Sequence, residues 1–297
     1  MKALVTGAGG QLASEWAAAA PAGWNVTALT RAQLDIADEG AVEAALSALK
    51  PDLILNAAAF TAVDRAEIDP EAAWRTNRDG ARAIAQGAAR IGAVIVHIST
   101  DFVFDGALGR PYQPEDKTAP LNVYGESKRA GEEAVLAAGA RALVVRTAWL
   151  YACDGRNFMN TMLRLMRERR EVRVVADQVG TPTSCASLAA ALWAMIELRQ
   201  AGVRHFTNAG VASWYDFAVA IGEEAQALGL LEGAVSVRPI GTSEYPTPAR
   251  RPSFSVLDCE ATWRALGEPP LHWRQALRAT LARIDHPARD GLLSAGS

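Results

Sequence analysis

Short apolar runs alternate with longer amphipathic segments over the first half of the chain. Five of these runs predict strands: residues 2–6, 25–29, 53–56, 94–99 and 142–146. Residues 2–6 and 53–56 are typical of buried strands. Helical patterns lie between them, from residue 11 to about 20, from about 70 to 91, and from about 122 onwards. This alternation predicts βαβ units, and therefore an α/β fold with a Rossmann-type, doubly wound parallel sheet.

The pattern changes after Thr147. Helices are predicted over 160–170, 187–201 and 213–227, and residues 204–208 form a late strand that could return to the sheet. The proline-rich stretch 243–252 predicts an irregular basic loop.

This change of pattern suggests two domains. We expect residues 1–147, together with 184–207, to form the dinucleotide-binding domain. Residues 148–183 and 208–297 would form a smaller substrate-binding domain, with the substrate cleft between the two and a frayed tail after about residue 286.

Composition excludes several classes of protein. Half of the 297 residues are hydrophobic, which is ample for a packed core, and the net charge is −3 without a basic stripe, so nucleic acid is not expected as a partner. No apolar run approaches the roughly 20 residues that span a membrane, and the chain begins with a strand pattern in place of a secretion signal. We therefore expect a cytoplasmic protein.

The spacing of the cysteine and histidine residues does not indicate a metal site. Cys153, Cys185 and Cys259 have the spacing of neither a zinc site nor a disulfide framework. His97 lies inside an apolar strand and is expected to be a satisfied core residue.

A glycine-rich turn follows the first strand and opens the first helix, which is the context of a dinucleotide-binding fingerprint. Gly7 would make the tight turn, and Gly10 would let the backbone approach a pyrophosphate at the helix N-terminus. Ala13 replaces the third glycine, whose packing role alanine can still fill. The alternative is an ordinary turn between a strand and a helix.

The end of the second strand bears on the choice of cofactor. NAD-preferring enzymes usually carry an acid there for the ribose 2′-hydroxyl, but this chain has Thr30 and Arg31. A guanidinium suits the 2′-phosphate of NADP. We therefore expect NADPH, with NADH as the alternative because Asp35 follows closely. Arg31 as a solvated surface residue is the other interpretation.

Tyr124 and Lys128 are the candidate catalytic pair, because residues four apart share one face of a helix. A cation within about 4 Å favours a phenolate by up to about 4 kcal/mol at an effective dielectric of about 20. That energy would bring the tyrosine pKa from about 10 towards 7, where the phenol can protonate a carbonyl oxygen. Thr100, at the end of the strand over 94–99, would hold the same oxygen. By itself, the pair is more typical of an exposed helix face, and the other motifs change that interpretation.

Together these motifs resemble the extended short-chain dehydrogenase/reductase family, and within it the branch of dTDP-sugar 4-ketoreductases. The resemblance extends to about residue 275. Its specific stretches are T-G-A-G-G-Q-L from Thr6, N-A-A-A-F-T-A-V-D-R-A-E from Asn56, N-R-D-G from Asn77, S-T-D-F-V-F from Ser99, P-L-N-V-Y-G-E-S-K from Pro120, R-T-A-W-L-Y from Arg146, D-Q-V-G-T-P-T from Asp177 and Y-P-T-P-A-R-R-P from Tyr245.

The resemblance implies that NADPH delivers hydride to C4 of the keto-sugar in dTDP-4-dehydro-L-rhamnose. Tyr124 would donate the proton, Lys128 would lower its pKa and hold the nicotinamide ribose, and Thr100 would bond the carbonyl oxygen. The implied cofactor-binding residues are Gly7, Gly10, Gln11, Leu12, Arg31, Asp35, Ile36, Ala57, Ala58, Ala59, Tyr124 and Lys128. The implied substrate-binding residues are Val63, Thr100, Asp101, Trp149, Asn157 and Arg251, with Trp149 against the sugar and Arg251 on the diphosphate.

Differences between this sequence and related families limit the reactions that it can be expected to catalyse. The 4,6-dehydratases carry Asp-Glu after the threonine, whereas Phe102 follows Asp101 here, so elimination lacks its base.

Some members are described as dimers clamped by a metal. Glu15 is present, but residues 184–193 offer no second acid, so we expect no metal, and a homodimer remains open. Two alternatives remain: another nucleotide-sugar reductase or epimerase, and an NADP-binding regulatory subunit of a partner enzyme.

Overall fold

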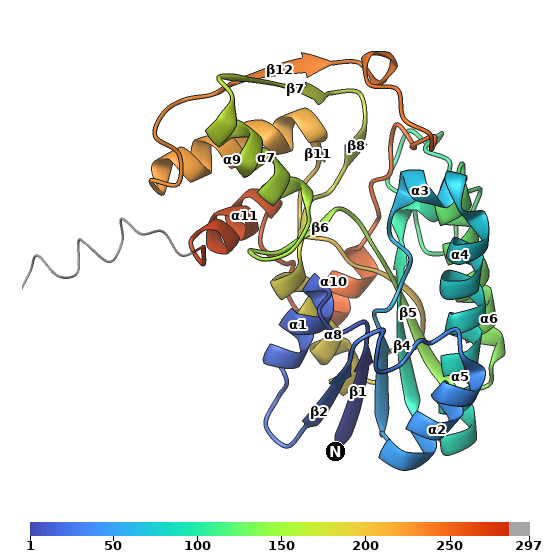
Figure 1. The fold of residues 1–297 in the computed structure, drawn as a ribbon. Coiled ribbons are helices and arrows are strands. Elements are labelled where there is room, and N and C mark those ends of the chain that lie inside the picture. Colours follow the sequence, from blue (N-terminus) through green and yellow to red (C-terminus); the bar gives the residue numbers. More distant parts are fainter. Residues whose placement is uncertain (285–297) are drawn as a thin grey trace, which may run out of the picture.

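A six-stranded parallel sheet lies at the centre of the computed structural model, which describes residues 1–284 (Figure 1). The tail that was predicted to fray lies outside this part of the chain. The strand order is β10-β5-β4-β3-β1-β2, and all the pairs are parallel. The strands are β1 (Lys2–Thr6), β2 (Asn25–Leu29), β3 (Leu53–Asn56), β4 (Val94–Thr100), β5 (Arg141–Thr147) and β10 (Gly202–His205). The five predicted strands and the late return to the sheet are confirmed.

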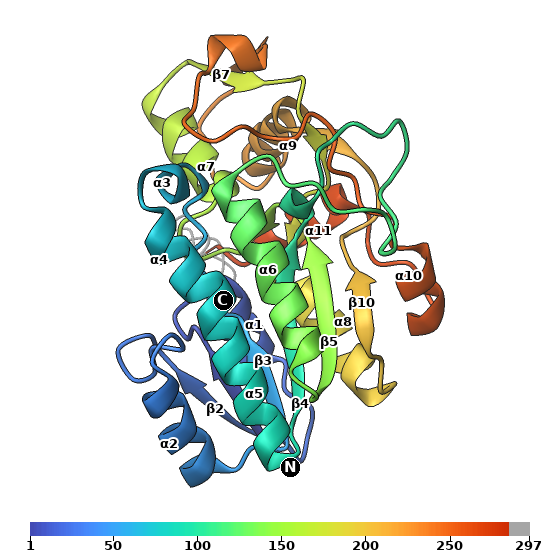
Figure 2. The same cartoon turned by 90° about the vertical axis from the view of Figure 1, so that its right-hand side faces the viewer.

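Helices cover both faces of this sheet, as the prediction of a doubly wound fold requires (Figures 1 and 2). On one face, α1 (Gln11–Ala18) packs against α8 (Cys185–Glu197), and the rings of Trp16 and Trp193 stack with centroids 4.2 Å apart. On the other face lie α2 (Glu39–Leu49), α5 (Ala81–Ile91) and α6 (Val123–Ala137). Sequence analysis missed α2, although the Asp38 side chain caps it, which is a signal that a sequence can carry.

The helix predicted over about 70–91 contains a π-helical turn. It consists of α4 (Pro70–Trp74), the turn η1 (Arg75–Gly80) and α5, and a further short helix, α3 (Val63–Ile68), precedes it. The side chain of Asn77 in η1 bonds the backbone of Phe60 in both directions and also donates to the Ser127 hydroxyl of α6 at 3.0 Å. The widened turn thereby ties the segment after β3 to α6.

A second, smaller unit sits over one end of the sheet, and we call it the cap (Figure 1). Its core gathers buried side chains of three helices, and β12 pairs in parallel with β7 beside them. Sequence analysis predicted two of these helices but missed α11, β7 and β12. The cap elements are α7 (Phe158–Glu168), α9 (Trp214–Ala227), α11 (Trp273–Leu281), β6 (Leu150–Tyr151), β7 (Glu171–Val175), β8 (Val179–Gly180), β9 (Thr183–Ser184), β11 (Ala212–Ser213), β12 (Ser236–Ile240) and η3 (Thr242–Glu244).

The chain passes repeatedly between cap and sheet. It enters the cap after β5, returns for α8 and β10, and goes back into the cap through β11. Residues 253–258 then run between the two units, because Ser255 N donates to Val179 O of the cap while Tyr112 N donates to Val256 O. We call these residues the strap. After it, α10 (Glu260–Leu266) packs against α8.

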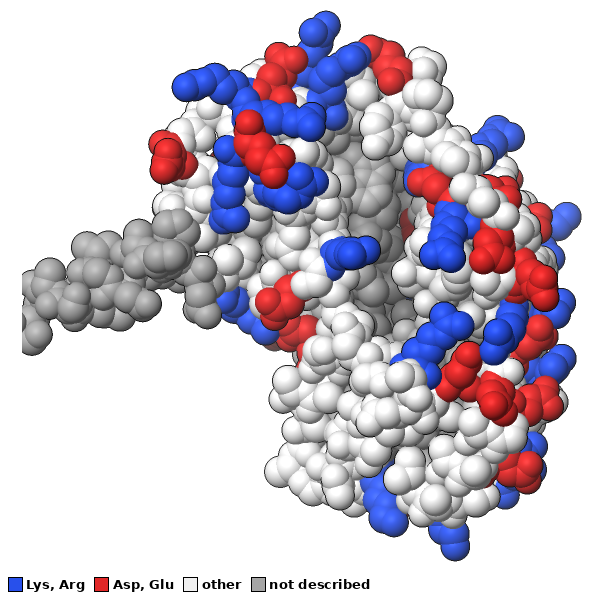
Figure 3. All heavy atoms as spheres, viewed as in Figure 1, with Lys and Arg blue, Asp and Glu red and all other residues white. Residues whose placement is uncertain are grey.

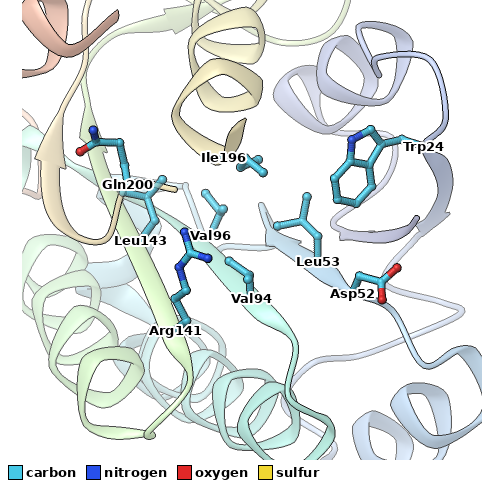
Figure 4. A pocket seen from close by; sticks show the side chains of 9 residues that line it. All are labelled: Trp24, Asp52, Leu53, Val94, Val96, Arg141, Leu143, Ile196 and Gln200. Carbon is cyan, nitrogen blue, oxygen red and sulfur yellow. The ribbon is translucent and has the colours of Figure 1, made fainter. Parts of the chain in front are cut away.

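Figure 3 shows a deep hollow between the cap and the part of the molecule that carries α3 to α5, with acidic and basic side chains mixed around it. A separate cavity of about 50 Å³ lies at the opposite, amino-terminal ends of β3, β4 and β5 (Figure 4). Its volume suits at most a water or two. Within residues 1–284, no helix has the length and apolar character needed to cross a membrane.

Candidate active site

The proposed catalytic side chains meet at the carboxyl end of β4, the edge where open α/β sheets bind ligands. The first turn of α6 lies against η2 (Asp101–Val103), since a Cβ added at Gly125 would lie 2.2 Å from Phe102 O. The ring of Phe102 meets the ring of Tyr124 edge-on, with centroids 5.8 Å apart. The Tyr124 phenol also has the Thr100 hydroxyl as a hydrogen-bond partner, so the two side chains lie side by side.

Asp101 is the buried carboxyl of the site. Its carboxylate accepts from the Thr100 hydroxyl at 3.0 Å and from the Ser255 hydroxyl of the strap at 2.5 Å, and it is only 2% exposed. Burial raises the pKa of Asp101 to about 6, although these two hydrogen bonds act in the opposite direction. Sequence analysis missed Ser255, because a lone serine 154 residues from its partner carries no signal.

The predicted effect of Lys128 on Tyr124 is not found in this arrangement. Burial raises the pKa of the Tyr124 phenol to about 12, with the charge of Asp101 adding to the rise and the Thr100 hydroxyl opposing it. The Lys128 ammonium instead donates to Ile98 O at 2.6 Å. The prediction of a lowered pKa is therefore wrong here, because desolvation of the phenol outweighs a cation that is directed elsewhere. Tyr124 holds its proton at neutral pH, as an acid must before it donates.

The glycine turn has the close approach expected of a pyrophosphate cradle. Gly7 has φ +77°, and a Cβ there would lie 2.8 Å from Ala58 N, so the turn packs directly on the segment after β3. No side chain caps α1 at Gly10, which leaves the first N–H groups of the helix for a ligand. These features fit the pyrophosphate of a dinucleotide. Ala57 to Ala59 line the neighbouring strand end.

Asn157, expected at the substrate, contacts the glycine turn. Its amide donates to Gln11 Oε1 at 2.7 Å, and Gln11 Nε2 donates to Arg156 O at 3.3 Å. A cavity of about 220 Å³ adjoins this contact, between α1 and the loop around Gly155. The contact ties the cap to the cofactor turn.

Arg31 and Asp35 lie together at the end of β2, as predicted. Arg31 is exposed and stands 3.6 Å from the Asp35 carboxylate, which also accepts from Arg75 at 3.0 Å. Sequence analysis did not predict Arg75, a second guanidinium beside this acid. Two cations suit a phosphate better than a free hydroxyl. Ile36 is buried beneath the π turn, where a Cβ at Gly80 would lie 2.7 Å from its side chain.

Trp149 lies in the cap wall. Its ring stacks on Trp214 with centroids 3.5 Å apart, and its backbone has φ +48°. A Cβ at Gly180 would lie 2.7 Å from the Trp149 ring, so the absence of a side chain at Gly180 makes room for the ring.

Arg251 connects the proline-rich loop to the sheet side. It donates two hydrogen bonds to the Asp64 carboxylate of α3, at 2.7 and 3.0 Å, next to the half-buried Val63. The pairing holds the pKa of Asp64 below its usual value. A substrate diphosphate at Arg251 would have to compete with Asp64.

Possible metal ligands are dispersed in the described part of the chain. No three His, Cys, Asp or Glu side chains gather there in a way that could hold a metal ion. Glu15, the acid singled out by the resemblance, pairs with Arg283 at 2.8 Å. The absence of a metal stays a prediction.

Comparison with known proteins gives the family. The family model for the RmlD substrate binding domain matches residues 1–286. The spore coat polysaccharide biosynthesis protein SpsK of Bacillus subtilis is 43% identical over 281 residues, which cover 94% of this chain and 96% of that protein. The dTDP-4-dehydrorhamnose reductase of Mycobacterium tuberculosis (strain H37Rv) is 44% identical over 290 residues, which cover 94% of this chain and 92% of that protein.

Solved structures agree with these relatives. The crystal structure of dTDP-4-dehydrorhamnose reductase from Bacillus anthracis, in complex with NADP, has a TM-score of 0.89 and 34% identity, covering 94% of this chain and 98% of that chain. A Thermus thermophilus UDP-glucose 4-epimerase complex with NAD has a TM-score of 0.79 at 19% identity, which shows the shared fold alone. The resemblance inferred from the motifs is confirmed.

Proposed function

This chain belongs to the RmlD substrate binding domain family, and from that premise we propose that it is a dTDP-4-dehydrorhamnose reductase. It reduces the C4 keto group of dTDP-4-dehydro-L-rhamnose to give dTDP-L-rhamnose. The observation that carries the proposal is the convergence of Tyr124, Lys128 and Thr100 at the carboxyl end of β4, beside the glycine turn.

The side chains divide the work of carbonyl reduction. NADPH, when bound, supplies the hydride, and the uncapped turn at Gly10 suits its pyrophosphate. Tyr124, whose pKa is raised, keeps its proton until it donates that proton to the developing alkoxide. Thr100 orients the phenol, and Asp101 fixes the direction of the Thr100 hydroxyl. The cap carries Trp149 for the sugar and Arg251 for the diphosphate.

Location and assembly complete the proposal. NADPH and nucleotide sugars are cytoplasmic metabolites, which supports action in the cytoplasm. A homodimer would have to form without the metal clamp of some family members, and sedimentation of the purified chain tests for it directly.

Loss of absorbance at 340 nm with NADPH and dTDP-4-dehydro-L-rhamnose tests the activity. Tyr124→Phe should reduce the turnover by at least about 100-fold, because only the proton donor is removed. Tyr215→Phe removes the same atom from a phenol of the cap helix α9 and should leave turnover unchanged. No oxidation of NADPH by the folded wild type would refute the proposal. A stable partner protein captured by such an inactive chain would favour the regulatory-subunit alternative.

A further inference from the structure

A line of four buried polar side chains crosses the sheet and ends at Lys128. Thr6, Asn56 and His97 lie in register on β1, β3 and β4, and none of the four is more than 2% exposed. Thr6 Oγ1 lies 2.8 Å from Asn56 Oδ1, Asn56 Nδ2 lies 3.1 Å from His97 Nδ1, and His97 Nε2 lies 3.5 Å from Lys128 Nζ. Sequence analysis treated His97 only as a core residue.

The hydrogen bonds of this line run in one direction. The Thr6 hydroxyl donates to Asn56 Oδ1, so the amide NH₂ group of Asn56 faces His97. An NH₂ group can only donate, and therefore His97 Nδ1 accepts. The neutral imidazole then carries its hydrogen on Nε2, facing Lys128. The ring stays neutral because burial and the Lys128 charge lower the pKa of His97 well below 6.5.

The distances from Lys128 Nζ to its neighbours agree with a hydrogen on His97 Nε2 that points towards Lys128. The 2.6 Å bond to Ile98 O is short, as for an ammonium, whereas 3.5 Å to His97 is at the long limit for a hydrogen bond. Burial lowers the pKa of Lys128 to about 8. The charge that opposes this shift is Glu132, on the same face of α6, which is itself held by Arg146 of β5 at 2.7 and 2.8 Å.

We propose that His97 is a positioning residue whose Nε2–H, fixed in direction by Thr6 and Asn56, favours the neutral amine of Lys128. This rests on the proposed function, in which Tyr124 gives up one proton per turnover. When the Tyr124 phenolate takes a replacement proton, an O–H bond forms there. An N–H bond of the Lys128 ammonium breaks, its proton passes to Tyr124 through a bridging water because the ammonium itself bonds Ile98 O, and the neutral amine then accepts from His97. The Lys128 ammonium regains its proton from solvent before the next cycle.

The tautomer of His97 tests the direction of the line without any substrate. The chain has four histidines, so ¹⁵N-histidine labelling gives a simple NMR spectrum, and His97→Gln identifies the His97 signals. We expect the proton on Nε2 at every pH at which the protein is folded. A proton on Nδ1 overturns the proposal, since Nε2 would then accept from the Lys128 ammonium.

Titration of Lys128 provides the second test. The chain has only four lysines, so ¹³Cε-lysine labelling resolves Lys128, which Lys128→Met identifies. Thr6→Val removes the hydroxyl that fixes the Asn56 amide, so the amide can turn its oxygen towards His97 Nδ1. His97 Nε2 can then accept a hydrogen bond from the Lys128 ammonium. The pKa of Lys128 should therefore rise by up to about one unit. Thr207→Val, an equally buried change beside Cys259, should leave it unchanged. An unchanged or lowered pKa in Thr6→Val refutes the role of His97.

The two tests are independent of the reductase assay. If the tautomer and the titration agree with the proposal but NADPH is not oxidised, the proposed function fails and the hydrogen-bond line stands. If the chain is active, the basic limb of the pH profile of kcat should move to higher pH in Thr6→Val, together with the pKa of Lys128.

Discussion

Replacing Asp101 by asparagine should make the protein more stable at neutral pH, although it removes a charge from the site. Asp101 is buried, and its pKa is about 6, against 3.8 for an ordinary aspartate. A carboxyl with a raised folded-state pKa binds its proton more tightly in the fold than in the unfolded chain. Ionisation therefore destabilises the fold, an effect that is absent below about pH 4 and complete above about pH 6. A shift of about two units corresponds to about 3 kcal/mol at pH 7.

Urea unfolding of wild type and Asp101→Asn between pH 4 and pH 8 measures this effect. Asparagine mimics the protonated carboxyl, so the difference in the free energy of unfolding should be near zero at pH 4. It should grow through pH 4–6 and level off at up to about 3 kcal/mol in favour of the variant. Tyr124, whose pKa the charge of Asp101 also raises, titrates above this pH range.

Asp116 offers a control of opposite sign. Arg110 lowers the pKa of Asp116 to about 2, so this carboxylate stabilises the fold above about pH 4, and that stability is lost as the pH falls towards 2. Asp116→Asn should therefore be less stable than wild type at pH 7. A difference for Asp101→Asn that does not change with pH would falsify the assignment of a raised pKa.

Three other substitutions test the supports of the site. Arg146→Met should cost about 3–5 kcal/mol in urea unfolding, because its carboxylate partner on α6 is left buried and unpaired. Gly131→Ala should cost at least about 1–3 kcal/mol in the same assay, since its Cβ would lie 2.1 Å from Asn77 O of the π turn, and wild-type stability would refute that close approach. Asp64→Asn should lower KM for the dTDP-sugar and leave KM for NADPH unchanged, because Arg251 loses its competing carboxylate; an unchanged sugar KM contradicts a role for Arg251 at the diphosphate.

The parallel sheet could be predicted because its inner strands β1, β3, β4 and β5 are largely buried, which gives them short and mostly apolar sequences. In the run 53–56 all four residues are buried and the first three are apolar, and the spacing between such runs leaves room for crossover helices. The glycine turn and the Tyr124–Lys128 pair could be predicted for a different reason. Each consists of residues that lie close together in the sequence.

Features that depend on distant residues were not visible. The strand β7 pairs with β12 some 65 residues later, and no pattern in the sequence around β7 predicts that pairing. Ser255 reaches Asp101 only after the chain has crossed the cap twice. The predicted direction of the Tyr124 pKa shift was wrong. The sequence shows neither how far the Lys128 ammonium lies from the phenol nor how deeply the phenol is buried. For His97, burial was predicted correctly, but the hydrogen-bond line requires three strands in register.

The repeated passage of the chain between sheet and cap has a consequence for biosynthesis. As the chain is made from its N-terminus, β5 is an open sheet edge until residue 205 has emerged and β10 can cover it. The pairing of β7 in the cap must wait for residue 240, and the strap that carries Ser255 is made after that. Contacts of such sequence separation form slowly. The catalytic centre is therefore assembled only when nearly the whole chain has been translated, and an unfinished chain exposes a strand edge to aggregation before it gains any activity.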